Sequence, residues 1–164
     1  MSETMRQQRD RYLVRSGLSV GAYGARRFHV RIGPLRIPMP NPGLLPLHDL
    51  HHVVTGYGTD IVGEAEISVF ELRTGPRKPM VALLCAGGIL FGLLLSPRRV
   101  LRAVRSTRGV RGLYHSTRTY DQLLDASVEE VRRELGIPAA GLAPGQFDQE
   151  EPERCSRSFA SPPS

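Results

Sequence analysis

The chain has 164 residues, of which 40% are hydrophobic, and a formal net charge of +6 at pH 7. This length and apolar content allow one modest hydrophobic core and argue against a second domain. The N-terminal segment MSETMRQQRDRYL is polar throughout, so we expect an intracellular protein and not a secreted one. Cys85 and Cys155 are too few and too far from the histidines for a disulfide framework or a thiolate metal site, and we expect free thiols.

The sequence before residue 48 predicts a flexible start followed by a short β-hairpin. Residues 1–10 are expected to be a flexible N-terminus, and residues 11–138 a single domain. Apolar and polar residues alternate over 28–32 and 35–39, on either side of a Gly-Pro pair that is typical of a turn. His29 falls on the polar side of this alternation and is left out of any site. Four prolines between positions 38 and 46 predict a stiff lead into the next helix.

Three of the five histidines lie within residues 48–52, in the segment LHDLHHVV. His48 and His52 stand one helical turn apart, and Asp49 falls on the same side of the helix. Leu50, Val53 and Val54 fall on the opposite side with Leu47, so the segment predicts an amphipathic helix. His51 does not fit the set, and we expect it at the exposed edge of the polar face.

A second helix supplies a further carboxylate. The turn-rich residues 55–59 precede Asp60, which is a suitable N-cap for a helix that runs through Glu64 to Leu72. Two antiparallel helices with a short connection would bring Glu64 to His48, Asp49 and His52. Imidazole and carboxylate ligands predict a divalent metal, zinc first, with iron and manganese as alternatives. A solvated helix face with local ion pairs is the simpler interpretation of the two histidines alone.

Residues 80–95 form an apolar run whose only polar side chain is Cys85, and arginines follow it. The run is shorter than the roughly 20 residues of a membrane span. A core helix and a surface that meets membrane or an isoprenoid tail both fit it. Residues 72–120 contain ten basic residues and no acid, so this part carries +10 and the rest −4. The arginines after Pro97 alternate with apolar residues, which favours a solvated face or anionic lipid over nucleic acid, because no nucleic-acid-binding motif accompanies them.

The C-terminal part predicts one helix and a tail. Thr119 or Asp121 can cap a helix with apolar residues at helical spacing that ends at Gly136 and Pro138. Tyr114 and His115 lie in the loop before it, and a structural role is expected for both. Residues 139–164 are rich in Pro, Gly, Ser and Glu and are expected to be disordered. The fold class predicted from the whole sequence is mainly α, a small helical bundle-like domain with a short β-hairpin before the ligand helix.

The pattern H-D-x-x-H-x11-E stands here in the setting HDLHHVVTGYGTDIVGEAEISVFEL. It resembles the family of ubiquinone (coenzyme Q) biosynthesis proteins called Coq-four, in a short bacterial-type form. The resemblance covers about residues 10–138 and includes PNPGLLPLHDLHHVVTGYGTD, SPRRVLRA and TYDQLLDASVEEVRRELGI. His48, Asp49, His52 and Glu64 match the metal-ligand positions of the family one by one. Only 47 residues precede His48, fewer than is usual in the family.

The resemblance implies a function in ubiquinone biosynthesis. The substrate would be a polyprenylated aromatic acid whose ring carboxyl is replaced by hydroxyl in an oxidative decarboxylation, with the metal as Lewis acid on the head group. The protein would lie on the inner face of the cell membrane, beside other quinone-biosynthesis enzymes. Because the N-terminal part is short, part of the lipid pocket would either be absent or be supplied by a second subunit in a homodimer.

Two other functions also fit the sequence. The protein could be a lipid-binding scaffold for other quinone-biosynthesis enzymes, with a metal that only joins two helices. It could also be a metal-dependent phosphohydrolase, which would need further ligands that His29 and His115 are poorly placed to supply. The sequence shows no separate general base, although Asp49 or Glu64 could leave the metal and take a proton.

Overall fold

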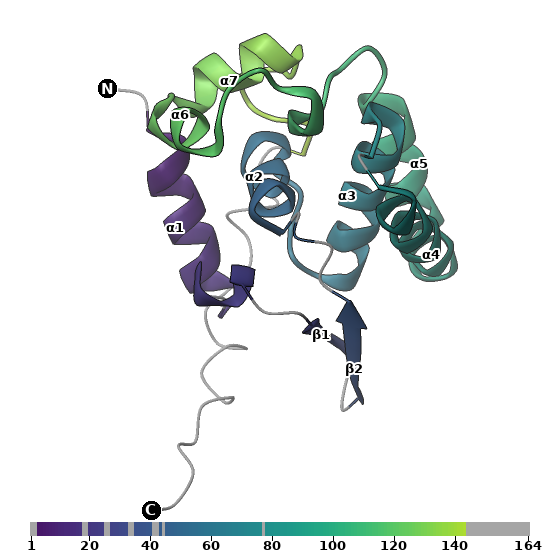
Figure 1. The fold of residues 1–164 in the computed structure, drawn as a ribbon. Coiled ribbons are helices and arrows are strands. Elements are labelled where there is room, and N and C mark those ends of the chain that lie inside the picture. Colours follow the sequence, from purple (N-terminus) through teal and green to yellow (C-terminus); the bar gives the residue numbers. More distant parts are fainter. Residues whose placement is uncertain are drawn as a thin grey trace, which may run out of the picture.

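The computed structural model describes residues 3–17, 20–24, 27–32, 35–40, 43, 45–76 and 78–143. Within these ranges the protein is mainly α-helical, which confirms the predicted fold class (Figure 1). The helices are α1 (Met5–Arg15), α2 (Leu45–Thr55), α3 (Ile61–Thr74), α4 (Pro79–Leu95), α5 (Pro97–Ser106), α6 (Tyr120–Asp125) and α7 (Val128–Leu135). Two short 3-10 helices are η1 (Val20–Gly24) and η2 (Leu113–His115).

Two strands precede the ligand helix. β1 (Arg27–Ile32) and β2 (Leu35–Pro40) pair antiparallel, with Val30 opposite Ile37. The predicted Gly-Pro turn at residues 33 and 34 lies outside the described residues, and so do the side chains of both strands. The predicted orientation of His29, on the polar side of its strand, therefore stays a prediction.

The N-terminal residues form α1, which begins at Met5, inside the segment 1–10 that was expected to be flexible. Thr4 and Gln7 form a reciprocal capping box at the start of this helix. Met5 is fully buried, and the guanidinium of buried Arg9 donates a hydrogen bond to the Tyr120 hydroxyl. The helix was not predicted from the sequence because α1 is rich in polar residues and buries only a few side chains, one of which is charged.

α2 lies at the centre of the fold. It packs between α1 and α3 and also contacts α7 and η2 (Figure 1). Pro46 stands in its first turn, where a helix needs no N–H donor, and Gly56 follows its end with a φ of +78°. The predicted apolar face is buried in the core through Leu50, Val53 and Val54. Because α2 has neighbours on several sides, more than this face is buried.

The carbonyl groups at the end of α2 are capped by residues near the C-terminal end of the described chain. Arg132 donates from Nε to the Val54 carbonyl at 2.8 Å, and the backbone N–H of Leu142 donates to the Thr55 carbonyl at 2.7 Å. Residues just beyond the predicted boundary at residue 138 therefore hold the end of α2. Residues 144–164, which contain most of the predicted disordered tail and Cys155, lie outside the described residues.

α3 begins at the predicted N-cap and packs along α4. The Asp60 carboxylate accepts a hydrogen bond from the Gly63 N–H at 2.7 Å. On the other side of α3, a Cβ placed at Gly92 of α4 would overlap the side chain of Ala65. A glycine at this position lets the two helices approach closely.

α4 turns most of its apolar side chains outward. Its buried residues are Val81, Cys85 and Gly92. Its exposed large apolar residues are Met80, Leu83, Leu90, Phe91, Leu93, Leu94 and Leu95, which together we call the α4 face. Because these side chains are exposed, α4 is not a buried core helix, which was one of its two expected roles. An exposed apolar surface of this kind is typical of an interaction site. No helix among the described residues is long and apolar enough to cross a membrane.

α5 follows α4 directly and has the predicted basic amphipathic character. Val100 and Ala103 are buried, and Leu101 is exposed. Its exposed arginines are Arg98, Arg102 and Arg105, and Arg108 is exposed just beyond its end. Arg99 instead pairs with α3, through Glu66 at 2.6 Å and Asp60 at 2.8 Å. One arginine therefore anchors α5 to the fold while the others face outward.

The predicted C-terminal helix is two helices. Thr119 caps α6 as predicted, but that helix ends at Asp125, and Ser127 caps α7 through a hydrogen bond from the Glu130 N–H. The break is stabilised by the N-terminal segment, because the Met5 N–H donates to the Ala126 carbonyl at 2.9 Å. Gly136, with a φ of +74°, ends α7 as predicted.

We predict that Gly92→Ala lowers the free energy of unfolding by about 1–3 kcal/mol, because the added methyl group must push α4 away from Ala65. Gly87→Ala is the matched control on the same helix, since a Cβ there meets no atom within 4 Å among the described residues. It should be neutral or stabilising by about 0.5–1 kcal/mol. Urea denaturation followed by circular dichroism measures both, and equal effects would contradict the packing described.

Candidate metal centre

His48, His52 and Glu64 converge on one point between α2 and α3. Each offers one ligand atom, and these three atoms lie within 4.8 Å of one another. His48 Nε2 is 3.4 Å from Glu64 Oε2, and His52 Nε2 is 3.5 Å from Glu64 Oε1. The predicted meeting of the first turns of α3 with the ligand helix is therefore confirmed for these three residues. They could hold a metal ion.

The ring of His52 is held so that Nε2 faces the centre. Its Nδ1 lies 3.1 Å from the Tyr57 carbonyl oxygen, which can only accept, so Nδ1 carries the proton and donates it. Nε2 is buried and has no hydrogen-bond partner within the described residues. A buried polar atom without a partner costs free energy, and a metal ion on the Nε2 lone pair would remove that cost.

His48 is oriented by a second carboxylate. Its Nδ1 lies 3.0 Å from Glu71 Oε1 and donates to it, which leaves Nε2 directed to Glu64. Burial favours the neutral ring, but the negative charges of Glu71 and Glu64 raise the pKa of His48 well above its usual value. Burial alone would raise the pKa of Glu64, but His52 and His48 lower it below its usual value, so Glu64 is ionised. A histidine that donates one ring N–H to a carboxylate and offers the other nitrogen is typical of metal sites.

Asp49, the fourth predicted ligand, lies beside this group but is not one of the three converging residues. Its Oδ2 accepts a hydrogen bond from the Tyr23 hydroxyl at 2.7 Å. The carboxylate is 4% exposed, and burial raises its pKa although His48 and His52 oppose the shift. Asp49 is thus close enough to interact electrostatically with both histidines, while its carboxylate is hydrogen-bonded to Tyr23. Its role as a ligand stays a prediction.

His51 is buried, contrary to the prediction from the sequence. It was expected at an exposed edge, but it is 0% exposed. Its Nδ1 donates to Glu71 Oε1 at 2.8 Å, and its Nε2 accepts the Leu113 N–H at 3.0 Å. Burial lowers the pKa of His51, so the ring is the neutral Nδ1–H form that this bonding requires. The expectation failed because η2 and α3 cover the side of α2 that a simple amphipathic helix would expose to water.

Glu71 is the residue that the sequence analysis missed. It follows Glu64 by seven residues, which is two turns of α3, so both stand on the same side of the helix. Besides His48 and His51, it accepts hydrogen bonds from the Tyr114 hydroxyl at 2.7 Å and from Cys85 Sγ at 3.6 Å. The seven-residue spacing between Glu64 and Glu71 is the feature of the sequence that could have predicted that both face the ligand helix.

Three other residues considered in the sequence, Tyr114, His115 and Cys85, lie outside the group of converging ligands. Tyr114 is buried beside His51 and reaches the centre through Glu71, whereas His115 is exposed and its Nε2 lies 2.9 Å from the Gly75 carbonyl oxygen. Cys85 is a buried free thiol, as expected, and burial raises its pKa to about 12. It is a donor to Glu71 and not a thiolate ligand.

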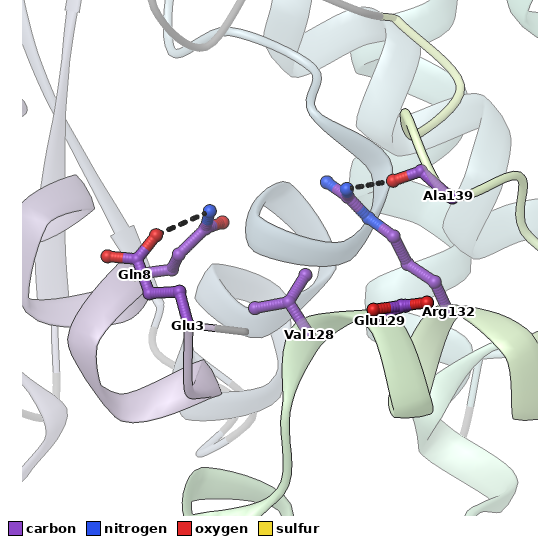
Figure 2. Close-up of a pocket in the computed structure, with 6 residues that line it drawn as sticks. All are labelled: Glu3, Gln8, Val128, Glu129, Arg132 and Ala139. Carbon is purple, nitrogen blue, oxygen red and sulfur yellow. Dashed lines mark hydrogen bonds between the residues drawn. The ribbon is translucent and has the colours of Figure 1, made fainter. Parts of the chain in front are cut away.

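A cleft elsewhere on the surface carries no comparable chemistry. Its lining residues are Glu3, Gln8, Val128, Glu129, Arg132 and Ala139 (Figure 2). Gln8 bonds Glu3 at 3.0 Å, and Arg132 bonds the Ala139 carbonyl at 2.6 Å and also caps α2. The polar groups of Gln8, Glu3 and Arg132 are therefore bonded within the fold.

Comparison with protein-family models, with curated proteins and with solved structures finds no match to this chain. The fold and the site therefore define the protein only as a helical domain with a candidate metal centre. Two imidazoles and one carboxylate would leave coordination positions for water or a substrate oxygen, as catalytic sites do. The Glu64 side chain is 46% exposed, so this side of the centre is open to solvent.

We predict that the purified protein binds about one equivalent of Zn²⁺, and that His52→Ala lowers the affinity by about 100-fold or more. The substitution removes the ligand whose Nε2 has no hydrogen-bond partner among the described residues. His115→Ala is the control, because His115 lies outside the converging group. Competition titration against a chromophoric chelator measures the affinity, and equal loss in both variants would contradict the site.

We also predict that metal affinity falls as the pH falls. The raised pKa of His48 means that a proton occupies Nε2 at pH values where a free histidine would be neutral. Metal must displace this proton, so below the pKa of His48 the affinity should fall by about tenfold per pH unit for one displaced proton. Titrations at several pH values measure the slope, and a flat profile across the neutral range would contradict this arrangement.

Proposed function

We propose that this protein is a metal-dependent enzyme of ubiquinone biosynthesis that acts on a polyprenylated aromatic acid at the membrane surface. The observation that carries the proposal is the open centre of His48, His52 and Glu64, with Nε2 of His52 buried and without a hydrogen-bond partner among the described residues. The pattern H-D-x-x-H-x11-E, which resembles the Coq-four family, supports the choice of substrate. The α4 face supports an apolar tail or membrane in the same domain.

The proposed reaction replaces the ring carboxyl group by hydroxyl. The carboxyl carbon leaves as CO₂, one oxygen atom of dioxygen joins the ring, and the other becomes water with two protons and two electrons from a reductant. A divalent metal, zinc first and iron or manganese as alternatives, would supply Lewis-acid stabilisation of the head group's oxygen. His48, His52 and Glu64 would hold it, and Asp49 is a further candidate ligand.

Residues of this chain would do the remaining work around the head group. Tyr57 and Glu71 hold the rings of His52 and His48, so the site is oriented before substrate arrives. When it is not bound to the metal, Asp49 would hold a proton during the reaction, because it is buried, bonded to Tyr23 and coupled to both histidines.

The surface of α4 and α5 supports a peripheral position on the inner face of the cell membrane. Leu94 is the most exposed residue of the α4 face, at 77%. α5 packs against α4 and presents Arg98, Arg102 and Arg105 to solvent. Apolar side chains would enter the head-group region while each arginine contributes on the order of 1 kcal/mol near anionic lipid.

A second candidate function is a scaffold for other quinone-biosynthesis enzymes, in which the metal is structural and a second copy completes the lipid surface. It is favoured by the division of the ligands between α2 and α3, because an ion there would join two helices. In that role, His52→Ala should lower the melting temperature as strongly as removal of the metal does. Ligand variants that stay folded and stable but inactive would decide for the enzyme.

We predict that cells whose quinone synthesis depends on this chain accumulate a carboxylated prenyl precursor when it carries His48→Ala together with His52→Ala. The variants remove two of the three converging ligands. Lipid extracts analysed by mass spectrometry measure the precursor and the quinone, with His115→Ala as the control. An unchanged quinone pool in the double variant, at equal protein level, would contradict the proposed activity.

A further inference from the structure

Glu71 carries a buried negative charge that four donors surround. The residue is 3% exposed and lies on α3. The donors come from three other elements and are His48 Nδ1 and His51 Nδ1 of α2, the Tyr114 hydroxyl of η2 and the Cys85 thiol of α4. A carboxylate can be buried at modest cost only when hydrogen bonds replace its water, and this set provides them.

The donors are not equivalent in what they do. His51 is locked at both nitrogens, since its Nε2 accepts the Leu113 N–H, and Tyr114 is buried against its ring with centroids 4.7 Å apart. These two groups fix the position of Glu71. His48 is different, because its second nitrogen points to Glu64 at 3.4 Å and is available to an ion.

We propose that Glu71 is the positioning residue of the metal centre, which holds the Nδ1 proton of His48 and so aims Nε2 at the point shared with His52 and Glu64. The inference rests on the proposed metal site. In this role Glu71 acts through His48 and touches no metal or substrate. Its charge also makes the His48 ring a stronger electron donor, as an acceptor carboxylate does for a metal-bound histidine.

A purely structural role would make a different prediction. α3 carries a second buried glutamate, Glu66, which is 1% exposed and pairs with Arg99 at 2.6 Å. Removal of charge from either glutamate perturbs a buried ionic contact of the same helix. Only Glu71 contacts a converging ligand, so only Glu71 should change the metal chemistry.

The first test is a pair of isosteric variants, Glu71→Gln and Glu66→Gln, in the full chain. Zn²⁺ affinity should fall by about 10–100-fold in Glu71→Gln and stay unchanged in Glu66→Gln. Co²⁺ absorption, which reports the ligand geometry, should change only in the first. Equal affinities and equal spectra in both variants would overturn the inference.

The second test needs neither metal nor a variant. ¹⁵N NMR of the metal-free wild-type protein at alkaline pH should find the proton of His48 on Nδ1, held by Glu71. A proton on Nε2 would overturn the inference even if the protein binds metal. If the protein binds no metal, the proposed function fails and the role of Glu71 in a metal centre fails with it, whereas the tautomer that Glu71 sets on His48 is decided by the NMR result alone.

Discussion

The buried charge of Glu71 is the constraint around which the centre of this protein is arranged. A carboxylate that has left water must be surrounded by donors, and here they come from α2, α4 and η2. This requirement fixes how α2 and α4 lie against α3 and where η2 meets them. It also determines the tautomers of two histidines, and the tautomer of His48 determines which nitrogen is left for an ion.

The same helix serves both chemical faces of the domain. α3 carries Glu64 and Glu71 toward α2, and it also receives the glycine-bearing stripe of α4, where Gly92 lies against Ala65 and Gly88 against Ser68. Because only that narrow stripe of α4 is buried, its leucines are left on the outside beside the arginines of α5. The polar centre and the apolar surface are therefore connected through one helix, and Cys85 on α4 contacts Glu71 directly.

Features with a local physical cause could be predicted from the sequence. The caps at Asp60 and Thr119, the glycine stop at Gly136 and the one-turn spacing of His48 and His52 depend on neighbours a few residues away. The approach of Glu64 to the histidines followed from a short connection between two helices. These are the elements for which the pattern and the structure agree.

Features that depend on distant parts of the chain were missed. The break between α6 and α7 is stabilised by Met5, more than a hundred residues away, and His51 is buried because η2 covers it. Asp49 lies on the predicted side of its helix but bonds Tyr23. In each case the prediction used only the periodicity of a single helix, whereas the environment of its side chains depends on tertiary neighbours.

The most direct test of this account is X-ray absorption spectroscopy of the zinc-loaded protein at the zinc edge. A centre built by His48, His52 and Glu64 predicts a first shell of nitrogen and oxygen only, at about 2.0–2.2 Å, with the outer scattering of two imidazole rings. A sulfur atom at about 2.3 Å, or a shell without imidazole scattering, would contradict it.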